Sequence, residues 1–545
     1  MTSAVMPGIN SHFIFKEDYT DEECKIIQTV SREWQVTSSG DPVRLSNSTY
    51  RFFLAKPARN FQEMFNIDRE IVFVFSPYSD IEPRTLDAID NAIRLFQALR
   101  LERICAVVIS KDADVQTKLR ELLKSNQESR IVVPFVYDEL LSPNSNPYFM
   151  RNRFKEHFYT RDLFAFQSPL RTDIYFFGRT DLVHEIASRH RSNESSGIFG
   201  LRKTGKTSLI YGIMRALAQD ESHAVLVDCQ NPAFHQRRWN EALYYLLNEI
   251  RSQLGLNILS LEEKLFTETD APILFERELV KIHGKFQQKS LLLIFDEIEN
   301  ITFQVSPSEH WRNGRDFVYF WQTLRSLFQE HSQVFTYLVV GTNPTCVESP
   351  SANGFDNPIF NQIPFQYIPG FDVPQTREMV RKLGKTMGIT FDEILYGKLT
   401  EDFGGHPFLI RQVCSIINKL LDPERPSSVG KAIYEQAKAK FSQEYQNYIE
   451  MILSVLRQYY PDEYAMLEYL AVNDTKTFKE FASLSPEYTN HLLGYGLIEQ
   501  VNGLYGFKIE SVKQHLAHKG RFKKLNPTPK EMLAEISERR NELEL

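Results

Sequence analysis

Sequence features that would indicate a metal site, a membrane span or secretion are scarce or missing from the 545 residues of this chain. It has five cysteines, which form neither a Cys-x-x-Cys pair nor a Cys/His cluster, and this excludes a zinc motif and a disulfide framework. No window reaches about 18 uninterrupted apolar residues, so we expect no membrane span. The N-terminus lacks the pattern of a secretory signal. We therefore expect a cytoplasmic protein without a membrane partner.

Charge and length set further limits. The formal net charge of −7 gives no general preference for nucleic acid or anionic membranes, so any such contact needs a local basic patch. With 42% hydrophobic and 24% charged residues, the composition is that of an ordinary globular protein. Single cores stop growing at roughly 250–300 residues, so about three or four domains are expected. The sequence contains no internal repeat.

The first part of the chain alternates β-branched runs with amphipathic segments. Runs at 71–76, 104–110 and 130–138 predict a small parallel α/β domain over 1–145. Pro, Ser and Asn then accumulate, which indicates a linker over 146–175. The order of elements resembles TIR-type domains, where Glu121 is a loosely placed catalytic candidate, whereas a nuclease would need acidic partners for Lys111. An effector and a non-catalytic sensor or docking domain both stay open.

The alternation resumes more strongly after Phe176. Strands are expected at 196–200, 223–229, 290–297, 335–341 and 365–371, which predicts a parallel α/β core over 176–372. The pattern then becomes helical, as in a lid over 373–440. Two short strands joined at Asn502-Gly503 give a strong hairpin signal, and with the preceding helices they predict a winged helix over 441–525. A charged helical tail is expected over 526–545.

The segment GLRKTGKT (200–207) matches the P-loop pattern G-x-x-x-x-G-K-[ST] between an apolar strand and a helix. Gly200 and Gly205 would let backbone N–H groups surround phosphates at a helix N-terminus. Lys206 would neutralise phosphate charge, and Thr207 would ligate Mg²⁺. The residues beside them in the same nucleotide-binding loop are Thr204 and Ser208. The alternative is a chance match in a Gly/Lys-rich turn.

A second Mg²⁺ ligand is expected at the end of a neighbouring strand. The segment SLLLIFDE (290–297) supplies Asp296 after an apolar run, and Glu297 follows it. A carboxylate next to the metal ligand is well placed to polarise the water that attacks the γ-phosphate, so this pair predicts hydrolysis as well as binding. Alternatively, the two carboxylates cap the helix that follows.

The strand spacing resembles that of P-loop ATPases with a catalytic glutamate, in which a polar residue on the next strand contacts the attacking water or the γ-phosphate. Here that residue is Asn343, with Thr342 beside it. The alternative is a turn-forming asparagine before Pro344.

Two further motifs are FFGRTDLV (176–183) and GGHPFLIRQVC (404–414). Together with the P-loop sequence, they resemble the motifs of the STAND ATPases, a branch related to AAA+ proteins. The resemblance implies that Gly178 and Arg179 flank the adenine, that Pro407 packs on it, and that Arg411 is a second sensor for the γ-phosphate. GGHP could equally be a helix-start turn with His406 in packing. The chain lacks the C-terminal repeats of a typical STAND protein, which leaves its trigger open.

The resemblance implies an ATP- and Mg²⁺-dependent switch, an ATPase that assembles as a homo-oligomer in its ATP state and acts in signalling or phage defence. An arginine finger would come from a neighbouring subunit, with Arg315 and Arg325 as candidates. The main alternative is an initiator- or loader-type AAA+ ATPase whose winged helix contacts DNA through Lys519, Arg521, Lys523 and Lys524, although a short basic run is more often a solvated face. A third alternative is a scaffold in which ATP is structural.

Overall fold

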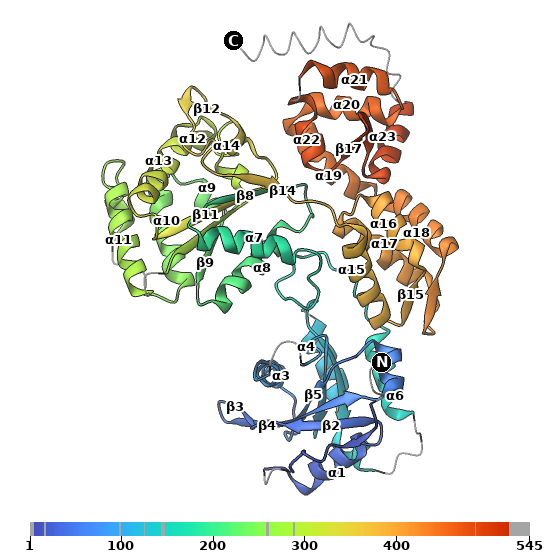
Figure 1. Ribbon diagram of the computed structural model, residues 1–545. Helices are drawn as coiled ribbons and strands as arrows, with labels where there is room; N and C mark the ends of the chain where they lie inside the picture. The colour runs from blue at the N-terminus through green and yellow to red at the C-terminus, as the bar shows by residue number, and fades with distance from the viewer. Residues whose placement is uncertain are drawn as a thin grey trace.

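The computed structural model describes residues 5–15, 18–96, 100–124, 126–142, 146, 148–257, 261–286, 289–485 and 487–522. Figure 1 shows a blue N-terminal α/β region, a green and yellow region around a second sheet, and an orange to red helical region. Among the described residues, no helix is long and apolar enough to cross a membrane. The expected tail over 526–545 lies outside them.

The N-terminal sheet is mixed, not parallel as the sequence analysis predicts. Its order is β1-β2-β4-β5-β6-β7, with β3 paired to β4; β5, β6 and β7 are parallel, whereas β4 runs antiparallel to β2 and β5. β2 and β4 escape prediction because polar residues interrupt them, as in the β2 sequence WQVTSS. The strands are β1 (Gly8–Ile9), β2 (Trp34–Ser39), β3 (Val43–Leu45), β4 (Ser48–Pro57), β5 (Ile71–Ser76), β6 (Cys105–Ser110) and β7 (Ile131–Val136).

Helix α6 occupies part of the range that the sequence analysis assigns to a linker. Its Phe154 ring lies 5.5 Å from Trp34 and 5.3 Å from Phe61, so α6 belongs to the N-terminal core. The rest of that range, residues 162–175, contains no helix or strand, and we call it the strap. The helices are α1 (Asp21–Val30), α2 (Arg59–Phe65), α3 (Pro83–Arg94), α4 (Val115–Lys124), α5 (Tyr137–Leu141) and α6 (Phe149–Phe158).

The second sheet is fully parallel and has the order β14-β8-β11-β10-β9. Its first strand along the chain therefore lies between the fourth and the fifth. β8, β10 and β11 are buried along their whole length, as expected for strands covered by helices on both faces. The strands are β8 (Ser196–Phe199), β9 (His223–Asp228), β10 (Leu291–Asp296), β11 (Phe335–Gly341) and β14 (Phe365–Tyr367).

Helices cover both faces of this sheet and form two separate apolar cores. One core involves α10, α11 and α13, and the other involves α7 and α8. The elements around the sheet are α7 (Thr180–Arg191), α8 (Lys206–Gln219), α9 (Pro232–His235), α10 (Trp239–Gln253), α11 (Ala271–Lys285), α12 (Glu309–Arg312), α13 (Arg315–Glu330), α14 (Thr345–Glu348), the 3-10 helices η1 (Glu263–Leu265) and η2 (Ile298–Ile301), and the strands β12 (Ser351–Ala352) and β13 (Phe355–Asp356).

The region after the second sheet is helical, with one correction. Strands do not stop there, because β15 (Ile389–Phe391) and β16 (Ser427–Val429) form a parallel pair; each has only three residues, too few for a recognisable pattern. The helices are α15 (Val373–Thr386), α16 (Glu393–Phe403), α17 (Pro407–Leu420) and α18 (Lys431–Glu444).

The C-terminal module consists of helices and one hairpin. β17 (Ile498–Val501) and β18 (Leu504–Phe507) are antiparallel, and the turn residues Asn502 and Gly503 have φ values of 52° and 78°. This confirms the expected hairpin at Asn-Gly, a dipeptide that tolerates left-handed backbone. The helices are α19 (Gln446–Tyr459), α20 (Pro461–Ala471), α21 (Thr475–Leu484), α22 (Glu487–Gly494) and α23 (Glu510–Phe522).

One apolar cluster joins regions that are distant in sequence. It contains Phe154 of the N-terminal region, Leu163 of the strap, Leu383 of α15 and Leu453 of α19. The N-terminal, lid and C-terminal regions therefore share a continuous core, whereas the second sheet has cores of its own.

Candidate nucleotide site

The P-loop lies where β8 ends and α8 begins. The Gly200 amide donates to the Gly341 carbonyl of β11, which anchors the start of the loop at 3.2 Å. Gly205 has a φ of 95° and directly precedes α8, a conformation that glycine adopts without steric cost. Thr204 is buried, and its hydroxyl donates to the Leu201 carbonyl at 2.8 Å. The loop therefore points its backbone toward the positive end of a helix, where anions bind.

Lys206 is buried beneath this loop. Its ammonium donates to the Gly200 and Leu201 carbonyls at 2.9 and 3.1 Å, and to the Thr342 hydroxyl at 3.3 Å. Burial lowers the pKa of Lys206, and the carboxylates of Glu297, Glu299 and Asp296 oppose this effect. These oxygen contacts can be exchanged for phosphate oxygens.

Thr207 and Asp296 meet between α8 and the end of β10. The Thr207 hydroxyl donates to Asp296 Oδ2 at 3.1 Å. Burial, with the charge of Glu297, raises the pKa of Asp296 to about 6, so a cation here would offset the cost of its charge. A hydroxyl and a carboxylate are the oxygen ligands that Mg²⁺ prefers, and the two predicted metal residues therefore fit the ion.

Glu297 begins the turn into η2 in a left-handed conformation, with a φ of 53°. Its amide donates to Asp296 Oδ1 at 3.0 Å, and its side chain lines a cavity together with Lys206 and Thr207. Left-handed backbone in a non-glycine residue is costly and is often found at functional sites.

A parallel sheet with a glycine-containing loop between β8 and α8 is the arrangement of a P-loop fold. No family model matches the sequence. No curated protein matches it either. Solved structures similar to it include the Walker-type ATPase of Pyrococcus abyssi, with 16% identity, a TM-score of 0.45 and coverage of 65% of this chain and 99% of that chain. The RuvB Holliday junction branch migration motor of Thermotoga maritima has 14% identity, a TM-score of 0.33 and coverage of 64% and 97%. The Aeropyrum pernix ORC1 protein in complex with DNA has 12% identity, a TM-score of 0.31 and coverage of 65% and 96%.

Glu299 is a third carboxylate that the sequence analysis missed. It is half-buried and accepts from the Thr342 amide at 3.2 and 3.3 Å. Burial and the neighbouring Glu297 raise the pKa of Glu299 to about 8. A β-carbon added at Gly341 would overlap this carboxylate, so the glycine makes room for it. The second glutamate of DEIE (296–299) is the feature of the sequence that could have indicated this third carboxylate.

Asn343 follows β11 and is buried. Its Oδ1 accepts from the Thr345 amide at 2.8 Å, as in the turn that the sequence analysis considered, and from the Tyr460 hydroxyl at 3.1 Å. Its Nδ2 is buried and has no hydrogen-bond partner within the described residues. Asn343 does not line the cavity, and its catalytic role stays a prediction.

The cavity beside the P-loop has a volume of about 410 Å³. The strap forms one wall of it with residues 166–170, which the sequence analysis treated as linker. The Ser208 hydroxyl accepts from the Leu170 amide at 2.9 Å, and Lys203 donates to the Gln167 carbonyl at 2.8 Å. The strap is therefore fixed to the middle of the phosphate loop and to the residue that follows it. The other residues that line the cavity without having been predicted are Arg202, Gln230, Phe408 and Met451.

Gly178 and Arg179 lie outside this cavity, against the segment that leads to the lid. Gly178 has a φ of 65°, and a β-carbon there would lie 2.9 Å from the Phe371 ring. The Arg179 guanidinium lies over the same ring at 4.7 Å, and burial lowers the pKa of Arg179 to about 10. One guanidinium nitrogen, Nη2, has no hydrogen-bond partner in the described part of the chain. Contact of these residues with adenine stays a prediction.

Two of the predicted lid residues line the cavity. Pro407 is the first residue of α17, and Arg411 lies one turn later. Arg411 donates to the Tyr175 carbonyl at 2.7 Å and to the Leu163 carbonyl at 3.3 Å, so its guanidinium holds the strap. Burial lowers its pKa to about 10. Its role as a second sensor stays a prediction.

The paired glycines before Pro407 let three segments approach each other. A β-carbon at Gly405 would overlap the Phe371 backbone, and one at Gly404 would overlap Ile509 of the C-terminal module. The Phe371 amide donates to the Gly405 carbonyl at 2.7 Å. His406, buried beside them, accepts from the Leu409 amide, and burial lowers its pKa to about 4. The motif thus joins the sheet, the lid and the C-terminal module.

The C-terminal module reaches the end of β11 through a cluster that we call the latch: Tyr460, Tyr495, His491 and Glu348. Tyr495 donates to the Thr342 carbonyl at 2.7 Å, next to the Tyr460–Asn343 contact. The His491 ring stacks on Tyr460 with centroids 3.7 Å apart. It is hydrogen-bonded to Glu348 at 3.1 Å and also to Glu463. The latch ties the expected phosphate-sensing strand end to α20 and α22.

The arginine-finger candidates lie on α13. Arg315 is exposed and lies over the Tyr319 ring at 5.5 Å, whereas Arg325 donates to the Pro358 carbonyl at 3.2 Å. Only Arg315 is therefore presented to solvent in a form that a neighbouring subunit could use.

The other predicted residues take up structural contacts or fall outside the described part. Lys519 pairs with Glu450 at 2.9 Å, Lys111 pairs with Glu22 at 2.7 Å, and Glu121 is exposed on α4. The Arg521 side chain, Lys523 and Lys524 lie outside the described residues.

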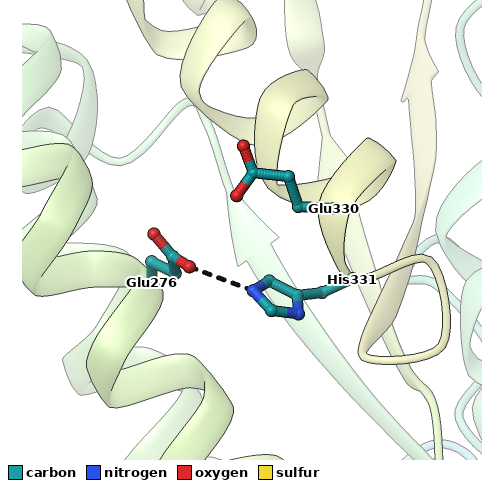
Figure 2. Close-up of side chains that lie close together, drawn as sticks. All are labelled: Glu276, Glu330 and His331. Carbon is teal, nitrogen blue, oxygen red and sulfur yellow. Dashed lines mark hydrogen bonds and ion pairs between the residues drawn. The ribbon is translucent and has the colours of Figure 1, made fainter.

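One group of carboxylate and imidazole side chains lies apart from the P-loop. Glu276, Glu330 and His331 approach one another where α11 and the end of α13 meet, and Figure 2 shows His331 bonded to Glu276. The His331–Glu276 distance is 3.0 Å. Glu330 is exposed, and nothing else at this place points to a metal.

Proposed function

We propose that this protein binds and hydrolyses ATP and uses the bound nucleotide to switch conformation, in the manner of STAND and other AAA-like ATPases. The observation that carries this proposal is the contact between Thr207 and Asp296 beside the buried ammonium of Lys206. Glu297 lines the same cavity. Phosphate binding, metal binding and water activation therefore have suitable residues within one site.

ATP would place its phosphates on the loop between Gly200 and Ser208, and its base between the strap and the start of α17. In this arrangement Lys206 exchanges its backbone carbonyls for phosphate oxygens and balances their charge. Mg²⁺, held by Thr207 and Asp296, would supply charge neutralisation at the β- and γ-phosphates. The walls offered by Phe166 and Pro407 are apolar, which suits a purine ring.

Glu297 is the residue that we assign to hydrolysis. Its carboxylate would orient a water molecule for attack on the γ-phosphate and accept a proton from it. Glu299 does not line the cavity and bonds to the Thr342 amide, so we assign it a positioning role behind Glu297. Asn343 would contact the water or the γ-phosphate if it turned away from Tyr460.

The latch is the element that we propose to couple nucleotide state to conformation. Tyr460 and Tyr495 are hydrogen-bonded to Asn343 and Thr342, the two residues that follow β11. Rearrangement of these two residues around a γ-phosphate would therefore compete with the latch. Release would free the C-terminal module and allow assembly with other copies, with Arg315 available as a finger. We place this switch in signalling or phage defence, which a phage challenge of cells carrying the protein would test.

The first experiment compares nucleotide binding. Lys206→Ala should lose ATP binding in a calorimetric titration, whereas Lys285→Ala, an exposed residue at the end of α11, should retain wild-type affinity. Unchanged affinity in Lys206→Ala would remove the assignment of the site.

The second experiment tests the switch. Light scattering should give a larger mass with ATP than with ADP, and Glu297→Gln should keep the larger mass because hydrolysis is slowed. A constant monomer would argue against the switch. Salt-sensitive DNA binding that is lost in Lys519→Glu would favour the initiator-type alternative.

A further inference from the structure

A cavity larger than the one beside the P-loop lies on the N-terminal region. Its volume is about 750 Å³, compared with about 410 Å³ for the cavity beside the P-loop. It is enclosed by α4, the turn at 126–130, the edge strand β7, the end of α6 and the start of the strap. This volume falls in the usual range of small-molecule sites, which is roughly 300–1,000 Å³.

Cationic side chains outnumber carboxylates in the lining of this cavity. Arg120 and Lys124 are exposed on α4, and no carboxylate pairs with either among the residues that the structure describes. The Arg161 guanidinium is fixed at the cavity wall by hydrogen bonds to the carbonyls of Ser129 and Gln127. Burial and the nearby charges of Arg153 and Arg120 lower the pKa of His157, which also lines the cavity, to about 4. The potential in the cavity is therefore positive.

The two carboxylates that line the cavity are engaged elsewhere. Asp162 accepts from the Ser415 hydroxyl at 2.6 Å and from the Phe164 amide at 3.0 Å. Glu156 lies 3.6 Å from the Arg153 guanidinium. The cationic groups that a ligand would meet are thus those of Arg120, Lys124 and Arg161, beside the hydrogen-bonding groups of Asn126 and Gln127.

We propose that this cavity binds a phosphate-bearing small molecule of nucleotide size or larger. Arginine and lysine are the side chains that recognise phosphate oxygens, through charge-assisted hydrogen bonds. The apolar part of the wall, formed by Leu119, Leu123 and Phe166, offers a surface for a base or another flat group.

The strap connects this cavity to the nucleotide site. Phe166 lines both cavities, and Arg411 of the lid lies over its ring at 5.3 Å. Asp162, at the wall of the larger cavity, is bonded to Ser415 on α17. A ligand that moves residues 160–166 therefore also moves a wall of the ATP cavity. This coupling, unlike the binding itself, depends on the proposed ATPase function, and it makes the ligand a candidate for the activating signal.

The binding experiment uses the Lys206→Ala variant, so that the P-loop does not compete for phosphate. Pyrophosphate and a cyclic dinucleotide are titrated by calorimetry. We expect binding that weakens about tenfold or more when Arg120→Glu and Lys124→Glu are added. The matched control, Lys25→Glu with Arg32→Glu, changes the same charge on exposed residues around α1 and should bind as before. Absence of binding by both probes, or equal binding in the two charge-reversed proteins, would overturn the proposal.

The coupling experiment measures ATP affinity of the wild-type protein with and without the probe that binds. A coupling free energy of the usual size changes affinity roughly 5–150-fold. Unchanged ATP affinity would refute the coupling and leave the binding site standing. Loss of ATP binding in every condition would instead count against the proposed function. Displacement of the probe by a short DNA duplex, with loss of that competition in Arg120→Glu, would overturn the small-molecule assignment in favour of nucleic acid.

Discussion

Removing the two tyrosine hydroxyls of the latch should shift the protein toward the ATP-bound, assembled form that we propose. Tyr495→Phe removes a donor to the Thr342 carbonyl, and Tyr460→Phe removes a donor to Asn343 Oδ1. Phenylalanine retains the rings and therefore the stacking of residue 460 on His491. A neutral hydrogen bond contributes about 0.5–1.5 kcal/mol, so the pair contributes about 1–3 kcal/mol. This corresponds to a change of roughly 5–150-fold in the switch equilibrium.

The assay is particle mass by light scattering against ATP concentration. The midpoint of assembly in the double variant should fall by a comparable factor. Tyr488→Phe is a matched control, because its half-buried ring is on the same module and its hydroxyl makes no hydrogen bond within the described residues. If the double variant has a normal melting temperature and assembles at the same ATP concentration as Tyr488→Phe, the latch does not restrain the switch.

Three further predictions concern the same strand end. Burial opposes protonation of His491, but hydrogen bonds to Glu348 and Glu463 outweigh it and raise its pKa from 6.5 to about 9; Tyr367, Tyr460 and Tyr495 also face this cluster. Protonated His491 therefore stabilises the latch fully below the unfolded pKa of 6.5, and this stabilisation is lost as pH rises toward 9. Because a weaker latch favours assembly, the ATP concentration needed for assembly should fall over this interval. His491→Gln should remove that pH dependence. Gly341→Ala would place its methyl group against Glu299 and should lower the free energy of unfolding, measured in urea, by about 1–3 kcal/mol. Gly397→Ala has open space around it on α16 and should raise the free energy of unfolding by up to about 1 kcal/mol. Equal stabilities of the two variants would contradict the close packing at Gly341. Glu299→Gln keeps an acceptor for the Thr342 amide and should change stability little, while Glu299→Ala leaves that donor unpaired and should cost about 1–3 kcal/mol; similar melting temperatures for both would remove the positioning role.

The proposed phosphate site can be recognised in the sequence because the pattern that defines it is local. A glycine loop followed by Lys206 and Thr207 needs only a strand before it and a helix after it, and both are visible as patterns. Asp296 is recognisable because it ends an apolar run, although its contact with Thr207 depends on the parallel order of the strands.

The strap could not be predicted in the same way. Its segment from Phe166 to Leu170 has no periodic pattern, and its position depends on contacts with Ser208, Lys203 and Arg411, which come from distant elements. Similarly, β2 and β4 are antiparallel strands that include several polar residues, and their pairing is a tertiary property. Local propensity gives little information about such segments.

The latch lies between these two cases. The hairpin at Asn502-Gly503 has a clear local signal, but the contact of Tyr460 with Asn343 joins residues 117 positions apart. Tyrosines in amphipathic helices resemble ordinary core residues, so sequence alone does not separate a regulatory contact from packing.

The continuous core described above affects how this protein can be divided. A fragment that ends between residues 145 and 175 would lose the lid helices that belong to the same apolar cluster as Phe158, and it would expose part of that cluster to water. The region around the second sheet has closed cores of its own and should tolerate isolation better. During synthesis, the N-terminal region emerges well before α15 to α18, so its final packing must wait for about 250 further residues, on the order of 10–50 seconds at ordinary rates of translation. Until then, a chaperone or the strap itself would have to shield this surface.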